Sequence, residues 1–164
     1  MSVTNHPQWQ SFVDQFNQIA VHHHRFEVFR DFVTMSAITM HNATFKDERL
    51  ESEYMQIMAK YKKDEMLLFC SLLAKLVVLL DGEPCDVLGT LYMALNLGST
   101  HMGQFFTPPT ICELMARVNF GDALAAEIPD FITLGEPTCG AGGMVLAFVQ
   151  LMIENGHNPA QKLW

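Results

Sequence analysis

A glycine-rich segment at residues 136–143, with the sequence E-P-T-C-G-A-G-G, has the residue types and spacing best suited to binding a small molecule. It follows a short apolar run at 131–134 and precedes an apolar helical pattern at 144–154. In a strand, loop and helix of this kind, glycines let the backbone approach a ligand, and free N–H groups at the helix start face it. We therefore predict a ligand site at Gly140, Gly142 and Gly143.

The spacing of this loop narrows the class of ligand. It is not the G-x-G-x-x-G of dinucleotide sites, and it lacks the Lys-Ser/Thr of a phosphate-binding loop. The carboxylate of Glu136, at the end of the apolar run, is placed to pair with an ammonium group such as that of an amino acid. S-adenosylmethionine combines an amino acid, a sulfonium and an adenosine, and is the predicted ligand. A tight turn without a ligand is the alternative that so short a motif leaves open.

Two upstream segments accompany the loop, D-V-L-G-T-L-Y at 86–92 and G-Q-F-F-T-P at 103–108. In this order the segments resemble motifs of the N6-adenine DNA methyltransferases, whose glycine loop reads D/E-P-x-x-G-x-G-G. The segment at 86–92 resembles a helix of the modification subunits of type I restriction systems. The resemblance covers residues 86–148, and before residue 80 it rests on helical character alone.

The resemblance implies a pocket for S-adenosylmethionine formed by the two later motifs. Glu136 would bind the methionine ammonium, and an aromatic ring of the 103–108 segment would pack against the cofactor, unless these rings are core residues. Cys139 is expected to be a small buried residue and not a nucleophile, because no His is placed in sequence to activate it. The predicted cofactor-binding residues are Gln104, Phe105, Phe106, Thr107, Pro108, Glu136, Pro137, Cys139, Gly140, Ala141, Gly142 and Gly143.

The chain lacks the family's N-P-P-[FY] loop, which holds the flipped adenine with its amine facing the sulfonium methyl. The sequence Asn158-Pro159-Ala160 comes too early and lacks the second proline and the aromatic residue, so we expect a loop there. An acidic residue after the second strand, which would hold the ribose, is also missing, although residues 162–164 are expected to begin that strand. We therefore expect no catalytic residue in these 164 residues, which would form the N-terminal part of a longer enzyme and be inactive alone.

Two hypotheses about function follow. The first is a DNA adenine-N6 methyltransferase that uses S-adenosylmethionine, with DNA, a specificity subunit or a second copy of the chain as partners. The second is a catalytically incomplete, methyltransferase-like interaction or anti-restriction protein, which the acidic charge and the missing loop fit better. An oxidoreductase with a nicotinamide site is disfavoured by the loop spacing.

The composition predicts a folded, cytoplasmic protein. Hydrophobic residues make up 49% of the chain and charged residues 17%, which is too apolar for a disordered segment. A net charge of -8 repels a phosphate backbone, so contact with DNA would need a local basic patch, a further segment or a partner.

No metal, export or membrane segment is expected. Cys70, Cys85, Cys112 and Cys139 form no C-x-x-C pair with matching His residues, and the adjacent side chains of 22–24 point in different directions if they lie on a helix. No signal peptide is recognisable, and the longest apolar run, 66–80, is too short to cross a bilayer.

The predicted fold is mainly α, with a helical domain at 1–97 followed, at 98–164, by the first strand, loop and helix of a Rossmann-like methyltransferase α/β domain. Apolar residues at helical spacing predict helices at 9–20, 26–40, 50–61, 64–80 and 85–95. Their Phe and Met stripes are expected to pack in the core, including the stripe Phe26, Phe29, Val33, Ala37 and Met40.

In the second domain, Thr110 and Glu113 predict a capping box for a helix through Val118, with an acidic connection at 121–129 and a strand at 131–134. Because one strand cannot make a stable sheet, this part should pack on the helical domain or pair with a second copy.

Overall fold

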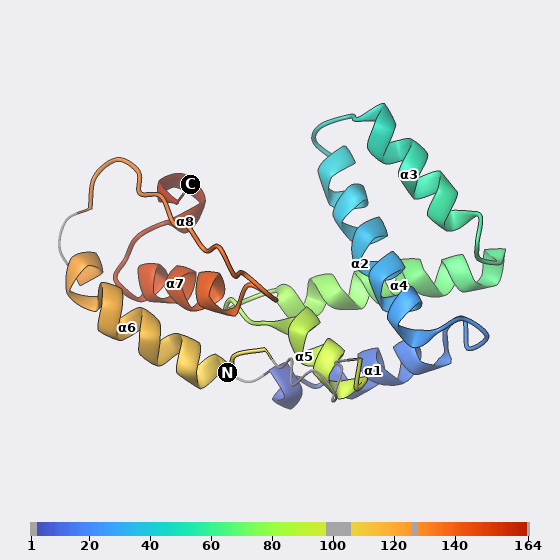
Figure 1. The fold of residues 1–164 in the computed structure, drawn as a ribbon, viewed down its shortest axis with the longest axis horizontal. Coiled ribbons are helices and arrows are strands. Elements are labelled where there is room, and N and C mark those ends of the chain that lie inside the picture. Colours follow the sequence, from blue (N-terminus) through green and yellow to red (C-terminus); the bar gives the residue numbers. More distant parts are fainter. Residues whose placement is uncertain (1–2, 98–105, 126–127, 164) are drawn as a thin grey trace. The chain divides into compact units, whose positions relative to one another are not determined.

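The computed structural model describes residues 3–97, 106–125 and 128–163, and this part of the chain is mainly helical, as predicted (Figure 1). Within these ranges no segment forms a strand. No helix there is long and apolar enough to span a membrane. The elements are η1 (Val3–Asn5), α1 (Trp9–Gln18), α2 (Arg25–Asn42), α3 (Glu48–Met58), α4 (Lys63–Leu80), α5 (Val87–Ala94), α6 (Pro109–Ala125), α7 (Gly143–Glu154) and α8 (Pro159–Lys162).

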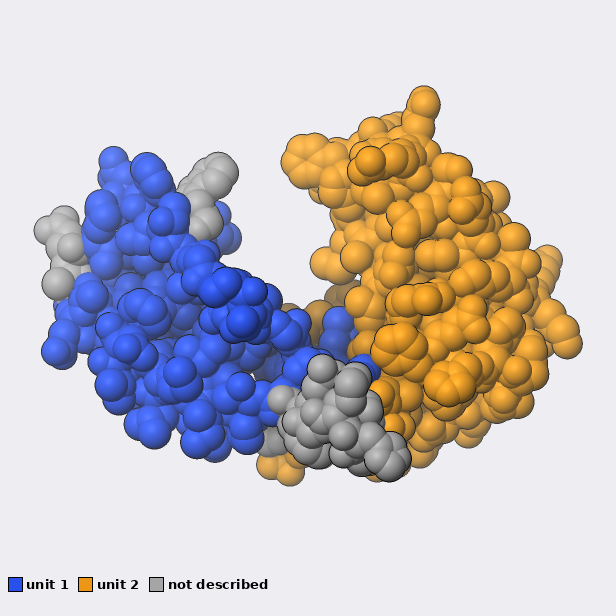
Figure 2. All heavy atoms as spheres, in the orientation of Figure 1, with its two compact units in different colours: residues 1–3, 82–93, 98–164 blue, residues 4–81, 94–97 orange. Residues whose placement is uncertain are grey.

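The chain forms two compact units (Figure 2). Unit 1 contains Met1–Val3, Gly82–Met93 and Gly98–Trp164, and unit 2 contains Thr4–Asp81 and Ala94–Leu97. The sequence pattern had assigned the helix at 85–95 to the N-terminal helical domain, whereas Gly82–Met93 groups with the C-terminal segment in the structure. The motif at 86–92 therefore lies in the same unit as the glycine-rich loop.

The core of unit 2 is built around the ring of Phe32 on α2. Its centroid lies 6.3 Å from that of Phe12, 6.1 Å from that of Phe16 and 6.2 Å from that of Phe69. All four rings are buried, and they come from α1, α2 and α4. Helix α1 packs with α4, and α2 packs with α3. The predicted inward face of the first helix is confirmed by the burial of Phe12 and Phe16.

Helix α2 turns a different face to the core from the one predicted. Phe26, Ala37 and Met40 of the expected stripe are exposed, and the buried residues are Val28, Asp31, Phe32, Met35, Ser36 and Ile38. Apolar side chains surround this helix on more than one side, so spacing alone did not select the face. The packing of Phe32 among the rings of α1 and α4 determines which face is buried.

The three adjacent histidines lie in the turn between α1 and α2, not on a helix. His22 Nδ1 is 3.5 Å from a carboxylate oxygen of Glu65, and His23 Nδ1 is 3.8 Å from one of Glu27. The Nδ1 atom of His24 accepts a hydrogen bond of 3.3 Å from the Phe26 N–H at the start of α2. Each ring therefore has its own partner in the packing of unit 2.

A polar network lies inside unit 2, centred on the carboxylate of Asp31, which is 2% exposed. It accepts hydrogen bonds from Lys60 Nζ and the Tyr61 hydroxyl, both 2.9 Å long, and from Arg30 Nη2 at 3.2 Å. Burial by itself raises the pKa of this carboxyl, but the three hydrogen bonds outweigh it and hold the pKa below its ordinary value. The network ties α2 to the residues that follow α3.

Unit 1 has its own core between α6 and α7, made of Cys112, Ala116, Leu124, Ile128, Ala147, Phe148, Leu151 and Met152. The ring of Phe120 meets that of Phe148 edge-on, with 4.9 Å between centroids. The predicted helix at 144–154 is confirmed, starting at Gly143.

Other predictions for unit 1 are corrected. Helix α6 begins at Pro109, so Thr110 lies within its first turn, and it runs to Ala125, past Val118. Proline suits the first position of a helix because its fixed φ fits the helix and because a backbone N–H at that position would have no partner within the helix. Asn158 is not in a plain loop, since its side chain accepts from the Ala160 N–H and caps α8.

The expected strand at 131–134 is reduced to one parallel bridge, between Ile132 and Leu163. The Ile132 N–H donates to the Lys162 carbonyl over 2.8 Å. A strand needs a ladder of hydrogen bonds to a partner along its length. Within the described residues, this bridge is the only pairing that the segment makes. Lys162, expected in a second strand, ends α8 instead.

We predict that Asp31→Ala lowers the free energy of unfolding by about 2 kcal/mol, because it leaves the buried Tyr61 hydroxyl without its acceptor. Asp14→Ala, which removes an exposed carboxylate on α1, should change it by less than about 0.5 kcal/mol. Urea unfolding measures both.

Because the pKa of Asp31 is lowered in the folded state, its contribution to the free energy of unfolding is present above about pH 4 and is lost as the pH falls through the folded pKa. An equal effect of both substitutions at neutral pH would contradict the network's role.

Candidate functional site

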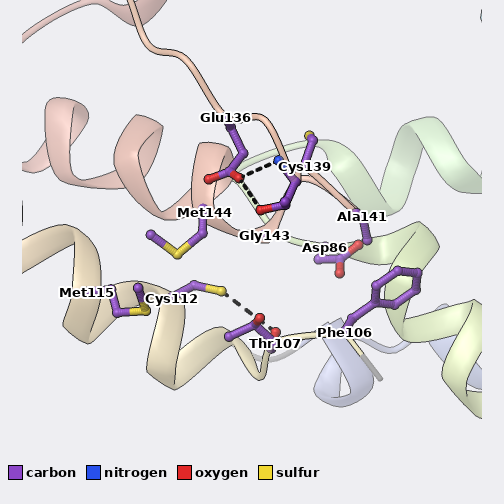
Figure 3. Close-up of a pocket in the computed structure, with 12 residues that line it drawn as sticks. Asp86, Phe106, Thr107, Cys112, Met115, Glu136, Cys139, Ala141, Gly143 and Met144 are labelled. Carbon is purple, nitrogen blue, oxygen red and sulfur yellow. Dashed lines mark hydrogen bonds between the residues drawn. The ribbon is translucent and has the colours of Figure 1, made fainter. Parts of the chain in front are cut away.

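The motifs predicted from the sequence meet at a pocket of about 290 Å³ in unit 1 (Figure 3). Its walls come from the start of α5, the segment leading into α6, one face of α6, the glycine-rich loop and the start of α7. The lining residues are Asp86, Phe106, Thr107, Cys112, Met115, Glu136, Thr138, Cys139, Gly140, Ala141, Gly143 and Met144.

Seven of the predicted cofactor-binding residues line this pocket: Phe106, Thr107, Glu136, Cys139, Gly140, Ala141 and Gly143. Pro108, Pro137 and Gly142 adjoin lining residues in the chain without being among them. Gln104 and Phe105 lie outside the described residues.

The half-buried carboxylate of Glu136 is held in place by the next turn of the loop. Its Oε1 atom accepts hydrogen bonds from the Thr138 N–H, at 3.0 Å, and from the Thr138 hydroxyl, at 2.8 Å. Figure 3 shows both bonds and the carboxylate at the edge of the pocket. Both bonds go to the same oxygen, so the loop holds the carboxylate at one end while the side chain lines the pocket.

The glycine-rich loop depends on a left-handed backbone. Gly140 has φ +54° and Gly142 has φ +81°, a region that costs other residues about 1 kcal/mol or more. The Gly142 N–H donates to the Cys139 carbonyl over 2.8 Å, and Gly142 forms the N-cap of α7. The free N–H groups of the first turn of α7 therefore begin at the pocket, and α7 supplies the lining residues Gly143 and Met144.

At Gly143 close packing, and not the backbone angle, favours a residue without a side chain. A Cβ at this position would lie 3.1 Å from the Cys112 sulfur, which is tighter than ordinary contact. That sulfur is also 3.7 Å from the Thr107 carbonyl, to which it donates. The start of α7 therefore packs directly on the first turns of α6.

Phe106 joins α5 to the loop. Its ring centroid lies 5.2 Å from that of Tyr92, the last residue of the 86–92 motif, and its ring atoms would be 3.5 Å from a Cβ on Gly140. The ring is half-buried and lines the pocket. The two interpretations of this ring, as a core residue or as a wall of the site, are thus compatible.

Asp86 is a lining residue that the sequence predictions did not place in the site. It stands just before α5, and its Oδ1 accepts the Gly89 N–H over 2.7 Å, which is the bond of an N-cap. Burial raises the pKa of this carboxyl above its ordinary value. The signal was present in the sequence, since Asp86 opens the 86–92 motif, but the motif had been treated only as a helix.

The cysteines at the site differ from expectation. Cys139, expected to be buried, is exposed and lines the pocket, whereas Cys112 is the buried one. Burial raises the pKa of the Cys112 thiol, and the negative charges of Asp86, Glu113 and Glu136 add to this effect. Cys112 therefore stays a neutral thiol that packs and donates a hydrogen bond.

The pocket is anionic. Its described lining includes the carboxylates of Asp86 and Glu136 and no basic side chain. The surrounding unit has the same bias, because its basic residues are Arg117 and Lys162, and its acidic residues are Glu83, Asp86, Glu113, Asp122, Glu127, Asp130, Glu136 and Glu154. Such a site favours a cationic ligand and disfavours one whose recognised group is a phosphate.

Comparison with protein families gave a match between residues 86–164 and the family described as N-6 DNA Methylase. The match begins at Asp86 and includes every residue that lines the pocket. Neither the search of curated proteins nor that of solved structures gave a match.

We predict that the Gly89→Ala variant has a free energy of unfolding lower than that of Gly121→Ala by about 1 kcal/mol or more. A Cβ on Gly89 would lie 2.1 Å from an Asp86 carboxylate oxygen, so the Asp86 side chain must leave its capping position. Gly121, inside α6, has nothing within 4 Å of such a Cβ and should gain helix stability. Thermal or urea unfolding of both variants measures the difference. Equal effects would mean that the Asp86 cap does not stabilise α5.

Proposed function

We propose that the unit 1 pocket binds S-adenosylmethionine as the donor for methylation of adenine in DNA, in line with the match of residues 86–164 to the N-6 DNA Methylase family. The observation that carries the proposal is the carboxylate of Glu136 beside a left-handed glycine loop at the start of α7. The methionine ammonium pairs with this carboxylate, and the backbone at Gly140 passes beside the ligand.

The size and charge of the pocket support this donor. A volume of about 290 Å³ is near the lower end for small-molecule sites and suits the methionine part of the molecule. Two carboxylates facing the pocket complement the ammonium and the sulfonium. The aromatic ring of Phe106, at the pocket wall, offers the ligand an apolar surface.

The DNA is bound mainly by other surfaces in this proposal, because unit 1 is acidic and a duplex needs cationic contacts. The 86–92 motif resembles that of type I modification subunits, and we therefore propose a specificity subunit as the partner that supplies sequence recognition. The sequence contains no N-P-P-[FY], and we assign no residue of this chain to holding the flipped adenine.

The family match favours a methyltransferase over the other hypothesis, a protein that acts only by binding a restriction-modification complex. The anionic pocket also has a use in the methyltransferase, where it receives a cationic donor.

We predict saturable binding of S-adenosylmethionine to the 164-residue chain in calorimetry, weakened roughly tenfold or more by Glu136→Gln through loss of a charge-assisted hydrogen bond. Asp130→Asn removes the same charge from an exposed position of unit 1 outside the pocket lining and should leave the affinity within about twofold. Absence of binding at millimolar ligand, or equal weakening by both substitutions, would contradict the proposed site.

A further inference from the structure

We propose that Asp86 is a specificity-determining residue that recognises the sulfonium charge of the methyl donor, so that the pocket distinguishes the donor from its neutral thioether product. The inference rests on the proposed function, since it takes the unit 1 pocket as the donor site. It goes further by giving each of the two carboxylates in the pocket a separate task.

The position of Asp86 is fixed from two sides. One carboxylate oxygen is held by the Gly89 N–H at 2.7 Å. The other carboxylate oxygen would lie only 2.1 Å from a Cβ on residue 89, so the carboxylate occupies space that only a glycine leaves open. The side chain is half-buried and lines the pocket together with Glu136 and Phe106. A charge held in this way interacts with a ligand at little cost in side-chain entropy.

A capping role by itself does not account for this burial. An N-cap needs only the side-chain oxygen and works at a solvent-exposed helix start, where the carboxylate keeps its hydration. Here the Asp86 carboxyl has lost part of its hydration, which raises its pKa, and no basic side chain is among the described residues that line the pocket. A cationic group of a ligand would supply the missing compensation.

The carboxylate of Glu136 lines the same pocket as that of Asp86. The charges of Asp86 and Glu136 both raise the pKa of the Cys112 thiol, on the α6 wall of the pocket, so their fields overlap there. S-adenosylmethionine carries two cationic centres joined by a short carbon chain, the ammonium and the sulfonium. S-adenosylhomocysteine keeps the ammonium and loses the sulfonium, so Glu136 faces a group that both ligands share and Asp86 faces a group that only the donor has.

The substitution Asp86→Asn separates this role from capping. Asparagine is as good an N-cap as aspartate, so α5 keeps its start and the fold is maintained while the charge is removed. Glu136→Gln is the matched control, because it also turns a carboxylate into an amide within the same pocket but faces the shared ammonium.

Calorimetry with both ligands on the wild-type chain, Asp86→Asn and Glu136→Gln tests the proposal. The wild type should bind S-adenosylmethionine more tightly than S-adenosylhomocysteine, and Asp86→Asn should reduce that ratio roughly tenfold or more. Glu136→Gln should weaken both ligands by a similar factor and keep the ratio. A ratio in Asp86→Asn within about twofold of the wild type would overturn the role of Asp86.

A second measurement requires no variant. Sinefungin carries an amine in place of the sulfonium methyl, so it has the charge of the donor without its sulfur. On the wild-type chain it should bind like S-adenosylmethionine, and binding as weak as that of S-adenosylhomocysteine would overturn the proposal. If none of the three ligands binds, the proposed function fails, and this inference with it, whereas equal binding of charged and neutral ligands defeats the inference alone.

Discussion

Gly140 and Gly142 turn the backbone through left-handed conformations just before the first turn of α7, and the arrangement of the site depends on this turn. It leads the chain from Glu136 into a helix whose next residue, Gly143, packs against Cys112 of α6. A side chain at Gly140 or Gly142 would strain the loop, and one at Gly143 would press against the Cys112 sulfur. The carboxylate of Glu136, the ring of Phe106 and the start of α7 line one pocket, and the loop between Glu136 and α7 passes beside that ring.

The two units contrast in how they use charge. Unit 2 contains most of the basic residues, and its buried carboxylate, Asp31, is compensated by Lys60, Tyr61 and Arg30. Asp86 in unit 1 accepts a hydrogen bond from the Gly89 N–H and faces a pocket lined, among the described residues, by another carboxylate and no cation. A buried carboxylate whose charge is compensated stabilises a fold, whereas an uncompensated one beside a cavity is suited to a cationic ligand. This difference supports the proposal that the ligand binds in unit 1.

The sequence predicted the parts of the fold that local chemistry decides. Helical spacing and capping signals located α1 to α7, whereas α8 lies where a loop and the start of a strand were expected; the glycine loop was expected where the structure has it. The prediction of the buried face of α2 was wrong, because that helix is apolar on several sides. The contacts of Phe32 with α1 and α4 decide which side is covered. The strand at 131–134 was predicted from an apolar run, but pairing is not local, and only Ile132 finds a partner within the described residues. Asp86 was missed because the 86–92 motif was interpreted only as a helix, and its place in a pocket depends on segments far along the chain.

We propose that the unit 1 pocket holds the methionine part of S-adenosylmethionine, and an NMR titration of the labelled chain with this ligand tests the proposal most directly. The account predicts saturable shifts of backbone amides at Glu136, Gly140, Gly143 and Phe106, with the amides of α1 to α4 in unit 2 unchanged. The absence of shifts at millimolar ligand, or shifts confined to unit 2, would contradict it.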